Sequence, residues 1–161
     1  MATAPSLETD LNPLTGDARP LSDWLTTFPL VLAAIDPYTH ESGWLLDTIE
    51  RIFHHFSGAD NRVAWLVAAD EPGTREFLGP LADDYLTFTD PDRTMIKSLA
   101  LDTLPALVVI KQDGSLLGSA EGWDPETWRP LAEMLATLTK WQRPTIPAQG
   151  DPVPYPGTPA L

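Results

Sequence analysis

Two apolar runs and the helical pattern between them constrain the fold of this chain most strongly. The runs are PLVLAAI, residues 29–35, and VAWLVAAD, residues 63–70. Each has the length of a strand and is almost entirely apolar, which is typical of strands in a sheet that helices cover on both faces. Between them, from Ser42 onward, apolar residues recur at the spacing of one helix face: Leu45, Ile49, Ile52, Phe53 and Phe56. Strand, helix and strand in this order predict a parallel β-α-β unit.

The second half of the chain predicts three further strands. YLTFTD, residues 85–90, is short and rich in β-forming residues. Residues 106–111 and 115–122 are apolar segments on either side of a turn. Asp113-Gly114 provides the positive φ that this turn requires, so the two segments predict an antiparallel β-hairpin.

Several helices are expected between these strands and after them. The last begins after Asp124, which serves as its N-cap, and runs through Leu138. Shorter helices are expected over residues 21–28, with Ser22 as N-cap, and over residues 73–84 and 92–100. We therefore expect an α/β fold in three layers, with a mixed central sheet and helices on both faces.

Proline content marks the two ends of the chain. Residues 1–20 are polar and hold three prolines, so we expect a flexible N-terminal arm there. Residues 141–161 hold six prolines after Arg143, and proline neither donates to a sheet nor continues a helix. We expect an extended tail, partly polyproline II, that is disordered, wraps over its own domain or docks on a partner. Residues 21–140 then form a single domain.

Charge and cysteine content exclude several classes of function. The chain has 10 Lys and Arg against 23 Asp and Glu, a formal net charge of −13. This charge repels phosphate backbones, so we expect no nucleic-acid binding, and it favours partners with a basic segment. Cysteine is absent, which excludes disulfides, thiolate nucleophiles and cysteine-ligated metals. The sequence has neither a signal-peptide pattern nor a run long enough to cross a bilayer, so we expect a cytoplasmic protein without membrane insertion.

The histidines do not indicate a metal site. His54 and His55 are adjacent, so on a helix their side chains point about 100° apart. Glu50 and His54 share a helix face, but two ligands do not make a zinc site. We expect neither metal nor cofactor, and no motif identifies a catalytic residue.

The turn after the first apolar run resembles the active-site turn of the thioredoxin family. In that family a buried strand ends, an aromatic residue follows, and a C-x-x-C motif starts a long helix. PLVLAAIDPYTHESGWLLDTIERI follows this layout without a gap. Tyr38 stands at the aromatic position, and Thr39-His40-Glu41-Ser42 stand where the family has C-x-x-C.

A second stretch, DTLPALVVIKQDGSLLGSAEG, resembles the hairpin region of the same family. Thioredoxins keep a proline, usually cis, before the first hairpin strand and beside the redox pair, and Pro105 stands at that place. Gly114 and Gly122 also match glycines of the family. The stretch TFTDPDRTMIKSLALDTLPALVVIKQDGSLL is similar to the peroxiredoxin-like and cytochrome-maturation branch. LSDWLTTFPLVLAAIDP is similar to the cysteine-less thioredoxin-like chaperones of nickel–iron hydrogenase maturation.

The resemblance covers residues 21–140 and implies a thioredoxin-like fold, but not thioredoxin chemistry. Disulfide exchange needs an attacking thiolate and a resolving thiol, and the hydroxyls of Thr39 and Ser42 cannot replace them. The buried acid that some thioredoxins place under their cysteines would fall near Ala33 and is missing. We therefore expect no dithiol oxidoreductase, disulfide isomerase or thiol peroxidase activity.

What the resemblance leaves is a surface for another polypeptide. The helix that starts at the turn would present free N–H groups, with Thr39 as its cap and Ser42 in its first turn. Backbone groups beside Pro105 would accept an extended peptide as an added strand. The expected partner-binding residues are Tyr38, Thr39, His40, Glu41, Ser42, Leu104, Pro105 and Trp123. The leading hypothesis is a redox-inactive protein-binding module, such as an assembly factor, chaperone or accessory subunit.

Two other functions stay open. The chain could bind or transfer a low-molecular-weight thiol, with the hydroxyl of Thr39 or Ser42 holding the thiolate. It could also be a structural subunit of a larger complex, tethered by both ends, and self-association is compatible with each hypothesis.

The remaining tryptophans have structural interpretations. We expect Trp44 and Trp65 in the core and Trp128 on the buried face of the last helix. Trp24 is expected to pack the first helix, and Trp141 to anchor the proline-rich tail.

Overall fold

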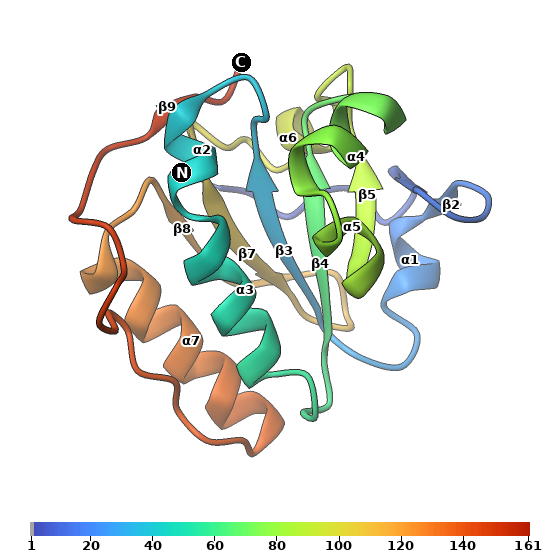
Figure 1. Ribbon diagram of the computed structural model, residues 1–161. Helices are drawn as coiled ribbons and strands as arrows, with labels where there is room; N and C mark the ends of the chain where they lie inside the picture. The colour runs from blue at the N-terminus through green and yellow to red at the C-terminus, as the bar shows by residue number, and fades with distance from the viewer. Residues whose placement is uncertain (1) are drawn as a thin grey trace.

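The structure is a computed structural model that describes residues 2–161. Its strands are β1 (Asp10–Pro13), β2 (Arg19–Pro20), β3 (Leu30–Ile35), β4 (Arg62–Val67), β5 (Leu86–Thr89), β6 (Thr103–Leu104), β7 (Ala106–Ile110), β8 (Leu116–Glu121) and β9 (Thr158–Pro159). Its helices are α1 (Leu21–Trp24), α2 (His40–Trp44), α3 (Leu46–His55), α4 (Glu71–Leu78), α5 (Leu81–Asp84), α6 (Thr94–Ser98) and α7 (Pro125–Thr139). The main sheet has the order β2-β1-β5-β4-β3-β7-β8, while β6 pairs with β9 (Figure 1).

The centre of the main sheet has the predicted mixed arrangement. Strand β3 is parallel to β4, with Leu30 opposite Arg62 and Ile35 opposite Val67. Strand β5 is parallel to β4 on its other side. Strands β7 and β8 form the predicted hairpin and join β3 in antiparallel orientation. The β-α-β unit and the hairpin inferred from the sequence are thus confirmed.

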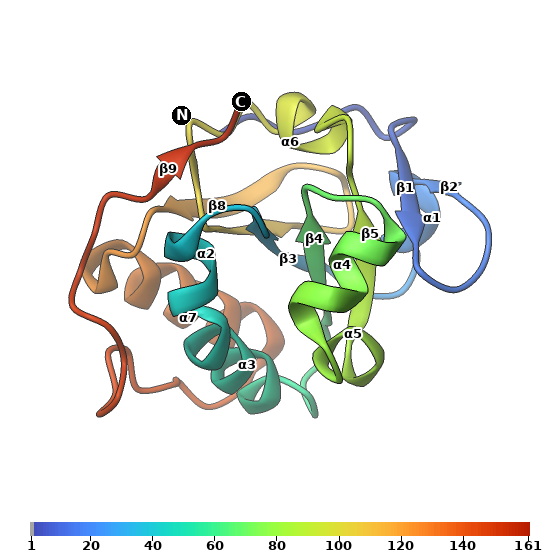
Figure 2. The same ribbon diagram turned by 45° about the horizontal axis from the view of Figure 1, so that its top comes forward.

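Helices cover both faces of the sheet, which explains why the run in β3 is apolar throughout (Figures 1 and 2). One core cluster joins alternate residues of β3 to α3, α4, α5 and α7. A second cluster joins the other residues of β3 to α1 and α6. Since successive side chains of a strand point to opposite faces, both sets must be apolar. The two sets are Val31, Ala33 and Ile35 on one face and Leu30, Leu32 and Ala34 on the other. This is the predicted three-layer α/β architecture.

Two details of the helices differ from the expectation. Helix α7 has its predicted N-cap, because the Asp124 carboxylate accepts the Glu126 N–H at 3.0 Å. Ser22, however, is not an N-cap: Pro20 is extended and occupies that position, so α1 begins one residue before Ser22. The helix expected from Ser42 onward is divided into α2 and α3 at Leu45.

Residues 10–13 and 19–20 of the N-terminal arm form strands of the main sheet, which corrects the prediction of a flexible segment for this part of residues 1–20. Strand β1 pairs with β5, and β2 pairs with β1. Leu11 is buried in the cluster that also holds Leu21 and Trp24. Two of the three prolines that suggested a loose arm, Pro13 and Pro20, lie at the ends of these strands, where a missing N–H costs little.

The C-terminal tail, residues 141–161, is extended as predicted and packs against the domain. In both views it runs beside α7 and α3 and ends next to α2 (Figures 1 and 2). Its last residues form β9, which pairs antiparallel with β6. Among residues 2–161, no helix has the length and apolar character needed to span a membrane.

Candidate functional site

The turn that stands in place of the C-x-x-C motif is closed by its own hydroxyl groups. The Ser42 hydroxyl is fully buried, and its oxygen accepts the Asp36 N–H at 3.0 Å. The Thr39 hydroxyl donates to the Asp36 carbonyl oxygen at 3.0 Å. Thr39 holds the N-cap position of α2 but makes no capping bond, so the predicted cap is wrong, because its hydroxyl turns back toward Asp36. Both hydroxyls therefore form hydrogen bonds with the Asp36 backbone that stabilise the turn.

Asp36 and Arg93 form an ion pair at the end of β3 that sequence reasoning did not identify. The Arg93 guanidinium lies 2.7 Å from the Asp36 carboxylate, and the Asp36 side chain is almost buried. The other oxygen of Asp36 accepts the Tyr38 N–H at 2.9 Å. Arg93 precedes α6, whose start is fixed by the Asp90 carboxylate through the backbone N–H groups of Met95 and Ile96. Asp90 therefore helps to hold Arg93 against the turn.

Burial and hydrogen bonds act in opposite directions on the Asp90 carboxyl. Burial raises its pKa above the ordinary value and outweighs the stabilising effect of the N–H groups of Ile96 and Met95. A buried carboxyl group requires hydrogen-bond donors, and the backbone N–H groups of α6 provide them for Asp90.

Strand β6 lies directly before Pro105, and the peptide bond between Leu104 and Pro105 is cis. Both residues are buried. We call the backbone edge of Thr103–Leu104 that pairs with β9 the β6 edge. Thr103 is opposite Pro159 and Leu104 opposite Thr158, so the tail of this same chain lies along that edge.

Trp123 lies beneath the tail and is fully buried. Its backbone exchanges two hydrogen bonds with Tyr155, at 2.9 and 3.0 Å. Its indole N–H donates to the Pro152 carbonyl oxygen at 2.8 Å. Trp123 was expected to line an open groove, and it instead contacts the segment that fills this place.

Tyr155 connects the tail to the turn. Its hydroxyl donates to the Glu41 carbonyl oxygen at 2.5 Å. Its ring meets the Trp44 ring edge to face, with 5.5 Å between the ring centroids. Burial raises the pKa of the Tyr155 hydroxyl above its ordinary value, and the Glu41 carboxylate adds to the effect, so the hydroxyl remains a donor at neutral pH. Trp44 is 57% exposed, which corrects its expected place in the core, because its ring packs on the tail instead.

The structure brings the predicted partner-binding residues together around the tail. Glu41 contacts Tyr155, Trp123 pairs with Tyr155, and Leu104 pairs with Thr158. Tyr38 and His40 are exposed on the turn, and the Tyr38 hydroxyl lies toward Gly73 in α4. Ser42, Leu104, Pro105 and Trp123 are buried. The expected groove is therefore occupied rather than open. Tyr155 could not be assigned to it from sequence, since an isolated bridge residue in a proline-rich tail carries no periodic signal.

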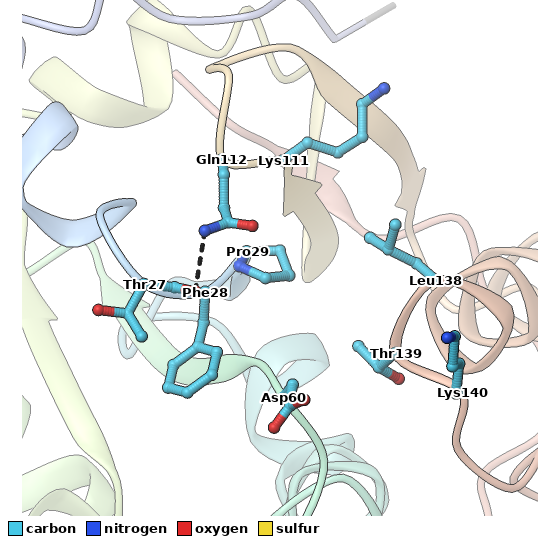
Figure 3. Close-up of a pocket in the computed structure, with 9 residues that line it drawn as sticks. All are labelled: Thr27, Phe28, Pro29, Asp60, Lys111, Gln112, Leu138, Thr139 and Lys140. Carbon is cyan, nitrogen blue, oxygen red and sulfur yellow. Dashed lines mark hydrogen bonds between the residues drawn. The ribbon is translucent and has the colours of Figure 1, made fainter.

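A hollow of about 480 Å³ lies away from this site, between the start of β3, the end of β7 and the end of α7 (Figure 3). Gln112 closes one side by donating to the Thr27 carbonyl oxygen at 2.8 Å. In Figure 3 the Lys111 side chain points away from the hollow, and Asp60 contributes a negative charge to its wall. The polar groups of this hollow do not converge on a common point.

Comparisons with known proteins agree with the fold. No family model and no curated protein matches the sequence. The thioredoxin domain of the thiol-disulfide oxidoreductase BVU-2223 from Bacteroides vulgatus has a TM-score of 0.65 and 10% identity, over 86% of this chain and 99% of that one. Peroxiredoxin Q from Xanthomonas campestris has a TM-score of 0.65 and 10% identity, over 81% and 91%. A secreted disulfide oxidoreductase of Mycobacterium tuberculosis, homologous to E. coli DsbE, has a TM-score of 0.59 and 14% identity, over 73% and 85%.

These solved structures confirm the fold that the turn and the Pro105 region predicted. At such identities the likeness concerns the fold and not the activity. The positions that hold the redox cysteines in thioredoxins are occupied here by Thr39 and Ser42. The chain is therefore a protein with the thioredoxin-like fold that contains no cysteine.

Proposed function

We propose that this chain is a redox-inactive thioredoxin-like module that binds another polypeptide, as an assembly factor, chaperone or accessory subunit. The observation that supports this most is the pairing of β6 with β9. An extended segment already lies along the β6 edge, and an edge that pairs with one extended segment offers the same backbone groups to another.

The bonds that hold the end of the tail, residues 155–160, are mostly made by backbone groups of the domain. The carbonyl oxygen of Asp102 accepts the Ala160 N–H at 2.9 Å. Trp123 contributes its N–H and C=O groups, and Glu41 contributes its C=O group. Backbone groups recognise the extended form of a chain and depend little on its side chains. A partner strand therefore has donors and acceptors ready once the tail is displaced.

The charge of the chain favours a partner with a basic segment. With a formal net charge of −13, the chain attracts positive segments at long range and speeds their encounter at low salt. The charge acts on the encounter, whereas strand pairing acts on the bound state.

The alternative function, binding of a low-molecular-weight thiol, lacks its donors in this structure. A hydroxyl that holds a thiolate must donate its proton to the sulfur. The Thr39 proton is already donated to the Asp36 carbonyl oxygen, and Ser42 is fully buried against the Asp36 N–H. Because these hydrogen bonds within the turn already use both hydroxyl groups, they favour the polypeptide-binding function.

Site-specific photocrosslinking tests the proposal with the full-length chain. Tyr38 is 74% exposed in the turn that belongs to the site, and replacing it by p-benzoylphenylalanine places a photoreactive group on this turn. Leu138 is 44% exposed near the end of α7 and provides the matched position away from the site. In extract of the source cells, we expect a discrete polypeptide adduct from position 38 that position 138 does not give. Identical adducts from both positions, or none from position 38, would contradict the proposal.

A further inference from the structure

The tail is fastened to the domain before it reaches the β6 edge. The Trp141 indole N–H donates to the His55 carbonyl oxygen at 2.7 Å, at the end of α3. Asp151 forms a 2.8 Å ion pair with Arg51 and accepts the Thr48 hydroxyl at 2.8 Å. The Asp151 side chain is only 6% exposed, so its carboxylate is largely removed from solvent, while the Arg51 side chain is 34% exposed. These two anchors bring the last ten residues to the site.

The last part of the tail, which we call the tail segment (Tyr155–Ala160), fits the site through specific side chains. The Tyr155 ring packs on Trp44, its hydroxyl donates to the Glu41 carbonyl oxygen, and its backbone pairs with that of Trp123. Ala160 is 1% exposed, so the position tolerates only a small residue. Exposed residues between and before these positions, such as Val153 at 80%, carry no such requirement.

Gly157 meets the domain most closely. A Cβ at this position would lie 2.5 Å from the Leu104 carbonyl oxygen, which is backbone and cannot move aside as a flexible side chain would. Its φ of +85° is also a conformation that residues with a Cβ rarely adopt. Only glycine lets the tail approach β6 this closely.

The end of the tail segment is held by the ion pair at the turn. Arg93 donates to the Ala160 carbonyl oxygen at 2.6 Å while its other nitrogen binds Asp36. The same guanidinium therefore joins the turn, the loop before α6 and the tail. Together, these contacts require particular residues at three positions of the tail segment. The first is a tyrosine, the second a glycine two residues later, and the third a small residue three residues after the glycine.

We propose that the tail segment is an internal ligand of the β6 edge, and that a partner polypeptide displaces it with an extended segment of the pattern Tyr-x-Gly-x-x-Ala. This inference rests on the proposed protein-binding function and specifies the partner of that site. Because the tail is covalently attached, it competes at an effective concentration of about millimolar. A partner therefore binds well only where the tail has been released or where its own segment binds more tightly.

Peptide binding to the full-length chain tests the competition. The probe is a fluorescein-labelled peptide with the sequence of residues 151–161, and the read-out is fluorescence anisotropy. The variant Gly157→Ala releases the tail of the chain, so the probe should bind it saturably. The wild-type chain should bind the probe roughly tenfold or more weakly, because its own tail occupies the site. The variant Tyr155→Ala provides a second, independent release, and circular dichroism verifies that both variants are folded.

Variants of the probe test the pattern. Peptides with Tyr155→Ala, Gly157→Ala or Ala160→Glu should bind the released chain about tenfold or more weakly than the parent peptide. The Val153→Ala peptide is the matched control and should bind like the parent. If neither released chain binds the probe, or if all peptides bind equally, the inference is overturned. A position-38 adduct with a segment of unrelated sequence would also overturn the pattern, yet it would leave the proposed protein-binding function standing.

Discussion

Ser42 and Asp36 show how the turn keeps its shape without sulfur. The Ser42 oxygen accepts the Asp36 N–H at 3.0 Å, and both residues are buried. We expect Ser42→Ala to lower the free energy of unfolding by about 1–3 kcal/mol, because it leaves a buried N–H without a partner. Ser57→Ala removes an exposed hydroxyl that bonds the His54 carbonyl oxygen, and it should cost about 0.5 kcal/mol or less. Urea denaturation measures both, and equal losses would argue against the structural role of Ser42.

A second residue-scale prediction concerns Tyr85 and alkaline pH. Burial and the hydrogen bond to Glu50 raise the pKa of Tyr85 to about 12, from 10.0. The folded state therefore keeps this proton at pH values where the unfolded state has lost it. Since stability falls with pH wherever the folded state binds more protons, the free energy of unfolding should decrease between about pH 10 and about pH 12.

The variants Tyr85→Phe and Glu50→Gln separate this effect from the rest of the chain. Tyr85→Phe removes the titrating group, so its stability should decrease less steeply over the same range. Glu50→Gln removes the charge beside the hydroxyl and should give an intermediate slope. Denaturation midpoints measured at intervals of pH provide the test, and identical slopes in all three proteins would refute the assignment to Tyr85.

At the scale of elements, the sequence predicted the strands and helices that have a recognisable pattern within their own residues. Strands β3, β4, β7 and β8 carry apolar runs, and helix α7 carries both a cap and a periodic face. Strands β1, β2, β6 and β9 have two to four residues each and were missed. Such short strands exist through distant pairing, and β6 and β9 are separated by 54 residues at Leu104 and Thr158. No local propensity can specify a contact of that kind.

The arm is the element whose prediction was wrong, and its contribution can be measured. Leu11 in β1 is 1% exposed, whereas Leu7, before the strand, is 42% exposed. Leu11→Ala should lower the free energy of unfolding by about 2–5 kcal/mol, the usual cost of a cavity at a core leucine. Leu7→Ala should cost less, because the Leu7 side chain is already 42% exposed to solvent. Similar effects for the two variants would show that β1 is not part of the cooperative core.

At the scale of the whole molecule, the candidate site is made by segments from across the chain. The turn after β3, the β6 edge, the corner at Trp123 and the tail segment meet at one end of the sheet (Figure 2). The family resemblance predicted that the turn, Pro105 and Trp123 would be neighbours. It could not predict the tail, because the tail lies outside the aligned residues 21–140. Docking of the tail is therefore a feature that only the structure could reveal.

Gly122 tests this arrangement from the domain side. A Cβ at Gly122 would lie 2.5 Å from the Pro156 carbonyl oxygen, so Gly122→Ala should push the tail away without altering any tail residue. We expect tryptophan emission to shift to longer wavelength as Trp123 becomes hydrated, and amide exchange to accelerate over residues 155–160. Gly150→Ala is the control, because Gly150 also has a positive φ but has no atom within 4 Å of an added Cβ. Both variants carry the same kind of backbone strain, so a spectral shift in Gly122→Ala alone reports loss of docking. Equal spectra and equal exchange in the two variants would mean that the tail does not depend on close approach at this corner.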